Sequence, residues 1–414
     1  MKFDRISIIG LGYIGLPTAA VIASNGIRVF GFDINHGTVN TINNGKIHIV
    51  EPGLEELVRR AVDDGYLTAH TIPQQADVFL VAVPTPFQGE NKEPDLSFIQ
   101  QAAISLAPCL KPGNLVILES TSPVGTTEKM ANWLSEARPD LTFPHTAKAG
   151  VCSDVKVAYC PERVLPGHVV RELVDNDRII GGLDTASTEA AMVFYRLFVK
   201  NGECIATTAR TAEMSKLAEN SFRDVNIAFA NELSFICDRQ GIDVWELISL
   251  ANRHPRVNIL QPGCGVGGHC IAVDPWFIVN QNPEQAKIIK QARLVNDYKP
   301  LYVVEKIEGV LSEMSSRKIA CLGLSFKPNV DDLRESPALN ITRILAGAPQ
   351  NEILVVEPYI SALPHEFSDF ENVQLMTLTD ALEKADIVVQ LVNHRQFSSV
   401  SIACGQHVRY IKFC

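Results

Sequence analysis

The sequence of 414 residues has few cysteines, an excess of acidic over basic residues and no long apolar run. Its ten cysteines are scattered and show no zinc-site spacing, so we expect neither a disulfide framework nor a metal site. With 37 basic against 47 acidic residues, the net charge of -10 repels a nucleic-acid backbone. No apolar run approaches the roughly 18 residues of a membrane span, and the first apolar run is typical of a strand, not a signal segment. We therefore expect a cytoplasmic protein without nucleic-acid or membrane partners.

Short apolar segments alternate with helical segments through the first half of the chain. The composition, 46% apolar and 20% charged residues, is typical of a folded protein. The length of the chain predicts two or three domains. Strand-like runs occupy residues 6–9, 29–32, 77–83 and 115–119. Strands that alternate with helices predict an α/β domain with a doubly wound parallel sheet.

The middle of the chain has a different periodicity. From about residue 211 up to Gly241, no proline or glycine interrupts a run in which apolar residues recur every three or four positions, which predicts a long helix. A second helical segment is expected over 283–313. Because such a helix commonly spans domains or packs against a second copy, we expect a homodimer.

The α/β alternation returns near Arg317, and residues 385–392 echo residues 76–83. The predicted fold class is α/β, with two Rossmann-like doubly wound parallel-sheet domains joined by a long central helix. The expected domains are residues 1–208, residues 209–314, which contain the long helix and the expected dimer contacts, and residues 315–414. The active site is expected in a cleft between the two α/β domains.

A glycine-rich turn after the first strand predicts dinucleotide binding. Gly10, Gly12 and Gly15 form G-x-G-x-x-G, and Asp33 closes the next strand. The three glycines permit a tight turn, a close approach of pyrophosphate and close packing of helix on sheet. Since Asp33 accepts hydrogen bonds from a ribose diol and repels a 2′-phosphate, the cofactor is predicted to be NAD and not NADP.

The second α/β unit has a cationic loop in place of the glycines. Lys327 and Arg334 are expected to stand where glycines would hold a dinucleotide, which suits a smaller phosphorylated ligand such as a nucleotide diphosphate. A solvated surface loop is the alternative.

A second glycine-rich segment contains two cysteines. Four glycines within residues 263–268 precede Cys270, and Asp274 follows it. An aldehyde carries no transferable hydride until a nucleophile makes its carbon tetrahedral, which a cysteine thiolate does. Composition alone does not separate Cys270 from Cys264, and most cysteines are buried and inert.

Three further sets of side chains have both a chemical and a structural interpretation. Glu213, Lys216, Asn220 and Arg223 share one face of the long helix, where they hold an oxyanion or water, or are simply solvated. The hydroxyls of residues 120–127 bind a ligand or cap the next helix. Glu162 and Arg163 act on a substrate or form an internal ion pair.

Seven motifs resemble the UDP-sugar 6-dehydrogenase family, the four-electron enzymes that include UDP-glucose dehydrogenase. They lie in the order of the family and cover nearly the whole chain: IGLGYIGLP, AVPTP, ESTSPVGTTE, YCPERVLPG, AEMSKLAENSFRDVNIAFANE, GVGGHCIAVDP and SFKPNVDDLRESPA. Residues 252–259 are most similar to members that oxidise UDP-N-acetyl-D-mannosamine for bacterial surface polysaccharide. UDP-N-acetylglucosamine and UDP-glucose remain alternatives, followed by a two-electron hydroxyacid dehydrogenase and a non-catalytic NAD sensor.

The resemblance implies a role for each matching position. Cys270 corresponds to the nucleophile and Lys216 to an acid/base or oxyanion residue. Residues that hold intermediates and the hydrolytic water are implied to be Asn220, Asp274, Thr121 and Glu162. Cofactor contacts beyond the glycines are implied at Tyr13, Ile14, Asp33, Thr85 and Thr126. Substrate contacts are implied at Arg163, Val164, Arg223, Gly267, Lys327 and Arg334, with His254 and Arg256 reaching the site across the dimer. Cys264 departs from the family, which usually has proline there.

Overall fold

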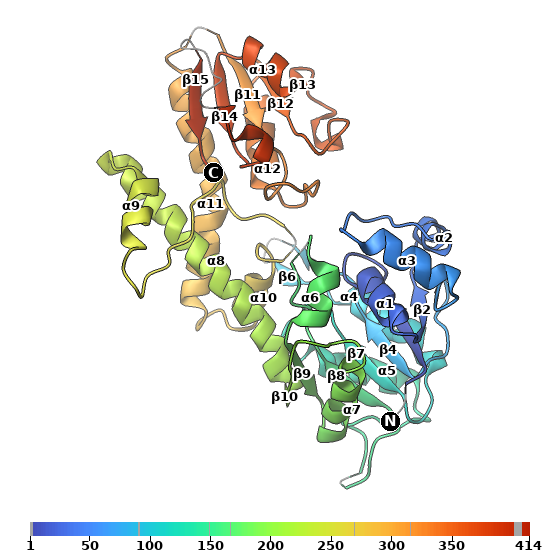
Figure 1. Cartoon of the computed structure of the whole chain (residues 1–414). Helices are drawn as coiled ribbons and strands as arrows, with labels where there is room; N and C mark the ends of the chain where they lie inside the picture. The colour runs from blue at the N-terminus through green and yellow to red at the C-terminus, as the bar shows by residue number, and fades with distance from the viewer. Residues whose placement is uncertain are drawn as a thin grey trace. The chain divides into compact units, whose positions relative to one another are not determined.

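The computed structural model describes residues 3–89, 92–148, 150–165, 167–268, 270–314, 316–400 and 408–414. The chain divides into two compact units, Met1–Glu219 and Asn220–Cys414, and the boundary falls inside the long helix α8 (Ala209–Gln240) (Figure 1). None of the described helices combines the length and apolar character that crossing a membrane requires.

The first unit is built on an eight-stranded sheet in the order β10-β9-β8-β7-β4-β1-β2-β3. Its neighbouring strands are parallel except for the antiparallel pair β8 and β9. The strands are β1 (Arg5–Ile9), β2 (Arg28–Phe32), β3 (Leu67–His70), β4 (Val78–Val81), β7 (Leu115–Leu118), β8 (Lys156–Tyr159), β9 (Arg178–Gly182) and β10 (Cys204–Thr208), with a hairpin of β5 (Phe87–Gln88) and β6 (Glu93–Pro94). From β3 to β8 this is the strand order of a dinucleotide-binding Rossmann sheet.

Helices cover both faces of this sheet. They are α1 (Gly15–Ser24), α2 (His36–Asn43), α3 (Leu54–Asp63), α4 (Ser97–Leu106), the 3₁₀ turn η1 (Ala107–Cys109), α5 (Thr126–Ala137), α6 (Val169–Asp175) and α7 (Thr185–Tyr195). One core lies between the sheet and α1, α3, α6 and α7, and a second between the sheet and α4 and α5. Because both faces are covered, strands such as β4 and β7 are buried along their whole length and read as continuous apolar runs.

The second unit contains a five-stranded parallel sheet in the order β13-β12-β11-β14-β15. Its strands are β11 (Lys318–Leu322), β12 (Glu352–Val356), β13 (Val373–Leu375), β14 (Ile387–Gln390) and β15 (Arg409–Lys412). Its helices are α9 (Val244–Ala251), α10 (Asp274–Gln281), α11 (Lys287–Leu311), α12 (Pro337–Ala346) and α13 (Leu378–Lys384), with the 3₁₀ turns η2 (His365–Phe367) and η3 (Arg395–Phe397). One core packs α11 and α12 on the sheet, and a smaller one packs α13 on the other face.

The predicted fold class is confirmed. The two segments that echo each other in the sequence hold equivalent places, because β4 pairs with β1 in the first sheet and β14 pairs with β11 in the second. The predicted long helices are α8 and α11. The first helix begins at Gly15, inside the glycine motif itself.

Candidate functional site

The glycine-rich turn between β1 and α1 is shaped by close backbone contacts at two of its three glycines. Gly10 has φ +92°, and a Cβ there would lie 2.5 Å from the carbonyl oxygen of Ala82. A Cβ at Gly15 would lie 1.8 Å from the carbonyl oxygen of Gly10. A Cβ at Gly12, in contrast, would meet no described atom within 4 Å. The first and third glycines are thus needed by the fold, whereas the second leaves backbone open to a ligand such as a pyrophosphate.

Polar groups beside this turn fit the rest of a dinucleotide. Asp33 follows β2, and its two oxygens accept hydrogen bonds from the backbone N–H groups of Leu11 (3.0 Å) and Asn35 (2.9 Å), which fix the carboxylate at the edge of the turn. The hydroxyl oxygen of Thr85 is buried without a hydrogen-bond partner among the described residues. Tyr13 and Ile14 are partly buried in the turn that enters α1. The open backbone at Gly12, the fixed carboxylate of Asp33 and the unpartnered hydroxyl of Thr85 together suit the binding of NAD.

The turn before α5 is hydrogen-bonded to the carboxylate of Glu213, a contact that the sequence did not predict. Glu213 of α8 is fully buried and accepts hydrogen bonds from the backbone N–H groups of Gly125 (2.6 Å) and Thr127 (2.8 Å). Burial raises the pKa of Glu213 above its ordinary value. The buried Thr126 hydroxyl donates to the Pro123 carbonyl (2.6 Å), and Thr121 is half-buried. The N-terminus of α5 is thus satisfied by a carboxylate from another helix and not by the hydroxyls of its own turn.

Glu162 and Arg163 each form an ion pair, in line with the structural alternative, but with other residues and not with each other. The nearly buried Glu162 carboxylate accepts from Nη1 of the buried Arg178 at 2.8 Å and from the backbone N–H of Arg163 at 2.6 Å. The guanidinium of Arg163 forms a two-pronged ion pair with Glu219 of α8 (2.9 and 3.2 Å). Val164 is half-buried against the first core. Through these two ion pairs, the segment after β8 that contains Glu162 and Arg163 is joined to β9 and to the long helix α8.

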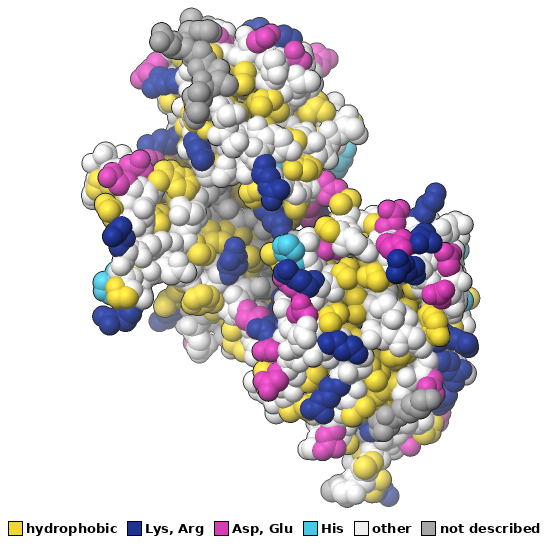
Figure 2. Space-filling view, in the orientation of Figure 1, with side chains coloured by type: hydrophobic (Ala, Val, Ile, Leu, Met, Phe, Trp, Pro, Cys, Tyr) yellow, Lys and Arg dark blue, Asp and Glu magenta, His cyan; other side chains and the backbone are white. Residues whose placement is uncertain are grey.

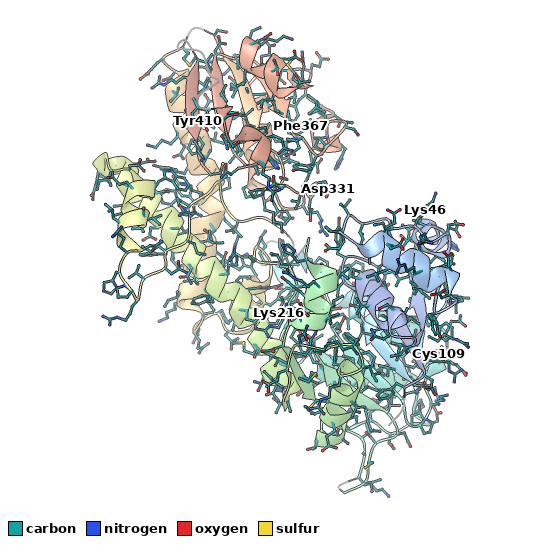
Figure 3. All side chains as sticks on the ribbon, in the orientation of Figure 1. Lys46, Cys109, Lys216, Asp331, Phe367 and Tyr410 are labelled. Carbon is teal, nitrogen blue, oxygen red and sulfur yellow. The ribbon has the colours of Figure 1, made fainter. Side chains whose placement is uncertain are left out.

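The predicted residues on α8 lie in different environments along the helix. Lys216 is half-buried on α8, as labelled in Figure 3, and Arg223 is exposed. Between them, the Asn220 amide donates a hydrogen bond to the buried carboxylate of Asp274, the first residue of α10. The helix face is thus not simply solvated, and two residues predicted to act together are brought into contact.

The structure distinguishes the two cysteines of the glycine-rich loop. Cys264 is buried, its Sγ donates to the carbonyl of Leu391 (3.3 Å), and burial raises its pKa well above the ordinary thiol value. Cys270 is partly exposed, and its carbonyl accepts from the N–H groups of Val273 and Asp274 (3.0 and 2.8 Å). The backbone of Cys270 therefore lies one turn before α10, at the N-terminal end of that helix. His269, beside it, lies outside the described residues.

The cysteine loop lies directly against the cationic loop that follows β11. The N–H of Gly268 donates to the carbonyl of Arg334 (3.1 Å), and a Cβ at Gly267 would lie 2.5 Å from the carbonyl oxygen of Glu335. Glu335 has φ +50°, a strained value for a residue with a side chain. Glycine is thus required at position 267 because two loops touch there, and the loop of the nucleophile candidate adjoins the predicted phosphate-binding loop.

In the cationic loop itself, Lys327 is half-buried near the Phe326 ring, 5.9 Å from its centre. Arg334 is exposed and pairs with Asp332 (2.6 Å). Asp331, labelled in Figure 3, lies on the same loop before α12. The cationic side chains of this loop are therefore accessible or partly accessible.

The comparison of the two glycine turns corrects one expectation. Gly323, with φ +96°, takes the place of Gly10: its N–H donates to the carbonyl at the end of the neighbouring strand, and the next N–H donates to a carboxylate, here Glu357 (2.7 Å). Counting from Gly323, the other two glycine positions are occupied by Ser325 and Pro328, not by Lys327 and Arg334 as expected. The loop continues to Pro337 before α12 begins, so no helix N-terminus follows the turn directly.

A loop after α9 projects the predicted cross-dimer residues into solvent. His254 and Arg256 are exposed, together with the rest of residues 253–258. The Asn252 amide closes the base of the loop with hydrogen bonds to both backbone groups of Ile259 (2.9 and 2.7 Å). The loop is thus an ordered projection rather than part of a core.

Comparisons with known proteins identify the family of the chain. Three models of the UDP-glucose/GDP-mannose dehydrogenase family match the chain: the NAD binding domain at residues 4–199, the central domain at 210–298 and the UDP binding domain at 320–408. The chain is 61% identical to a UDP-N-acetyl-D-mannosamine dehydrogenase of Campylobacter jejuni, over 100% of both chains. It is also 61% identical to an NDP-N-acetyl-D-galactosaminuronic acid dehydrogenase of Ralstonia nicotianae, over 96% of this chain and 92% of the other. A solved structure of the UDP-N-acetyl-mannosamine dehydrogenase from S. aureus has a TM-score of 0.86 and 42% identity, over 98% of this chain and 92% of the other. These matches confirm the family resemblance and NAD as the cofactor.

Proposed function

Because this chain belongs to the UDP-glucose/GDP-mannose dehydrogenase family and is an NAD-dependent oxidoreductase, we propose that it oxidises the C6 alcohol of UDP-N-acetyl-D-mannosamine to the uronate. The observation that carries this substrate is the full-length identity of 61% to the Campylobacter jejuni enzyme of that name. The co-occurrence of an NAD-type turn with a partly exposed cysteine in a glycine-rich loop supports a four-electron reaction.

The first unit holds the cofactor. The backbone at Gly12 would hold the pyrophosphate, the Asp33 carboxylate would accept from the ribose diol, and the Thr85 hydroxyl would bond a further polar group of NAD. Tyr13, Ile14 and Thr126 would complete the cofactor contacts. When bound, NAD accepts the hydride that leaves C6 in each of the two oxidations.

The second unit supplies the nucleophile. The Cys270 sulfur adds to the C6 carbon of the aldehyde and forms a thiohemiacetal, which the second oxidation converts to a thioester. Water then cleaves the carbon–sulfur bond, which releases the carboxylate and regenerates the thiol. Lys216 stabilises the oxyanion or takes the proton of the C6 hydroxyl, while the hydrogen-bonded Asn220 and Asp274 orient the intermediates. Thr121 and Glu162 orient the hydrolytic water.

The UDP-sugar is held by cationic and backbone groups. In this proposal Lys327 and Arg334 contact the diphosphate, and the backbone of Gly267 allows the sugar to approach the thiol. Arg223, Arg163 and Val164 complete the contacts with the UDP-sugar. Arg163 makes its contact while it is paired with Glu219. A reduced thiol is essential to this chemistry, so we place the reaction in the cytoplasm.

The covalent step is tested with Cys270→Ala and, as a matched control, Cys264→Ala. We expect Cys270→Ala to form no uronate while it binds NAD like the wild type, and Cys264→Ala to retain turnover because that thiol is buried away from solvent. The wild type is expected to produce two NADH per uronate. One NADH per product, or turnover by Cys270→Ala, would contradict the mechanism.

The Ralstonia nicotianae relative supports a second candidate substrate of the same class, a nucleotide-linked N-acetylgalactosamine derivative. Comparison of kcat/KM for UDP-N-acetylmannosamine, UDP-N-acetylgalactosamine, UDP-N-acetylglucosamine and UDP-glucose separates these readings. We expect the highest kcat/KM for UDP-N-acetylmannosamine. A higher kcat/KM for another of these sugars would make that sugar the proposed substrate instead.

A homodimer completes the proposal. On α8, Phe222, Phe229 and Ile236 are 73%, 53% and 45% exposed and lie seven residues apart, which gives one apolar stripe on the helix. Figure 2 shows hydrophobic side chains at the surface over α8 and α9. We propose that this stripe pairs with a second copy and that His254 and Arg256 reach the partner's site.

Mixing two inactive variants tests the crossing segment. If Arg256 serves the partner's site, random mixing of Cys270→Ala with Arg256→Ala restores about a quarter of wild-type activity, because half of the dimers are mixed and each mixed dimer has one complete site. If Arg256 serves its own chain, mixing restores nothing. Light scattering of Phe229→Glu, expected to be monomeric, tests the interface separately.

A further inference from the structure

A cluster of buried ionisable side chains lies in the first unit beneath the ends of β7, β8 and β9. We name it the Glu119 cluster: Glu119, Cys160, Glu162, Arg178 and Tyr195. Glu119 follows β7, Cys160 and Glu162 follow β8, Arg178 opens β9 and Tyr195 ends α7. Every member is at most 6% exposed, so each charge in the cluster must be balanced inside the protein.

The two carboxyl groups of the cluster have unequal partners. Glu162 accepts from Arg178 (2.8 Å) and from a backbone N–H (2.6 Å). Glu119 accepts one hydrogen bond, from the Tyr195 hydroxyl (2.8 Å), and its second oxygen is buried with no partner among the described residues. Within the described part of the chain, Arg178 is the only cation that forms an ion pair with either carboxyl group.

One cation cannot balance two buried carboxylates. The proton therefore stays on the carboxyl group without a cation, which is Glu119. Burial, and next the negative charge of Glu162, raise the pKa of Glu119 to about 8. Burial also raises the pKa values of Cys160 and Tyr195, so both of these stay neutral at physiological pH.

We propose that Glu119 is a positioning residue for Glu162: its protonated carboxyl group leaves the Arg178 guanidinium to Glu162 alone, which keeps the Glu162 carboxylate ionised and aligned at the end of β8. When Glu119 loses its proton, a second negative charge lies beside Glu162. The Glu119 carboxylate then competes with Glu162 for Arg178, which disturbs the alignment of Glu162. The inference rests on the proposed function insofar as Glu162 takes part in the reaction, but the protonation of Glu119 does not depend on that role.

The first experiment measures the proton directly and needs no activity. Difference infrared spectra of wild type minus Glu119→Gln are expected to contain the carbonyl band of a protonated carboxylic acid at pH 7, and the band should disappear as the pH is raised through about 8. In Tyr195→Phe the loss of a hydrogen bond to the carboxylate should move this titration to higher pH. Absence of the band at pH 7 would overturn the proposal.

The second experiment measures the consequence for turnover. Glutamine keeps the shape of the side chain and the acceptor for Tyr195 but cannot ionise. Wild-type kcat should fall about tenfold between pH 7 and pH 9 as one group with a pKa of about 8 titrates, whereas kcat of Glu119→Gln should not fall with that group. The kcat ratio of variant to wild type should thus rise about tenfold over this range, with KM for the UDP-sugar unchanged at pH 7.

Glu128→Gln is the matched control, since Glu128 is an exposed glutamate of the same unit paired with Arg210. Its pH profile should match the wild type. Equal profiles for Glu119→Gln and wild type would refute the positioning role even where the infrared band is present. Absence of turnover on every UDP-sugar would refute the proposed function instead, and the infrared result would still decide the protonation of Glu119.

Discussion

Replacement of Gly12 by alanine separates the cofactor role of the glycine turn from its structural role. A Cβ at Gly12 meets no described atom within 4 Å, and its φ lies outside the left-handed region. Gly-to-Ala changes at such compatible positions stabilise proteins by about 0.4–1 kcal/mol through the unfolded chain. The apoprotein should therefore melt at the same temperature as the wild type or slightly above it.

NAD binding should respond in the opposite direction. At an NAD concentration of 100 Kd, binding stabilises the wild type by about 2.7 kcal/mol. If the added methyl group weakens binding about 100-fold because it occupies the space of the pyrophosphate, the same concentration stabilises Gly12→Ala by only about 0.4 kcal/mol. Thermal unfolding with and without NAD measures both quantities in one assay.

Two other glycines provide the controls. Gly309→Ala, inside α11 with open space around its Cβ position, should raise stability by about 1 kcal/mol and keep the full NAD shift. Gly15→Ala should fail to fold normally, because its Cβ would lie 1.8 Å from the carbonyl oxygen of Gly10. A wild-type NAD shift in Gly12→Ala would refute the placement of the pyrophosphate over this turn.

Three further changes test the packing around the site. Arg178→Met removes the partner of the buried Glu162 carboxylate and should cost about 3–5 kcal/mol in the free energy of unfolding, measured by urea denaturation; a loss below 1 kcal/mol would mean that the ion pair contributes little. Asn231→Ala removes the buried acceptor of the Gly263 N–H (3.0 Å) and should cost about 1–3 kcal/mol, with faster hydrogen exchange in the cysteine loop; unchanged exchange would contradict the link. Since the pKa of Glu119 is raised on folding, the folded state retains a proton that the unfolded chain releases, so stability should fall between about pH 4.5 and about pH 8 by at most about 1.4 kcal/mol per pH unit. Melting temperatures of Glu119→Gln should lack this contribution, and parallel curves for the two proteins would rule it out.

Short-range patterns in the sequence were sufficient to predict the fold class and the cofactor. Strands buried on both faces appear as continuous apolar runs, and long helices appear as uninterrupted periodic segments, because each depends on residues close in the chain. The glycine spacing and Asp33 predicted NAD for the same reason, since a single strand–helix–strand unit contains both the glycine turn and the acidic residue. The echo of residues 76–83 in 385–392 likewise predicted two equivalent units.

Only the tertiary structure decided how side chains distant in sequence are partnered. Cys264 and Cys270 are six residues apart and alike in composition, but packing against Leu391 buries one thiol and leaves the other partly exposed. Glu162 and Arg163 are neighbours in the sequence, yet Glu162 pairs with Arg178. Glu119 accepts its hydrogen bond from a tyrosine 76 residues away. Protonation and ion pairing inside a protein depend on burial and on the nearest opposite charge, and both are set by the folded arrangement rather than by neighbours along the chain.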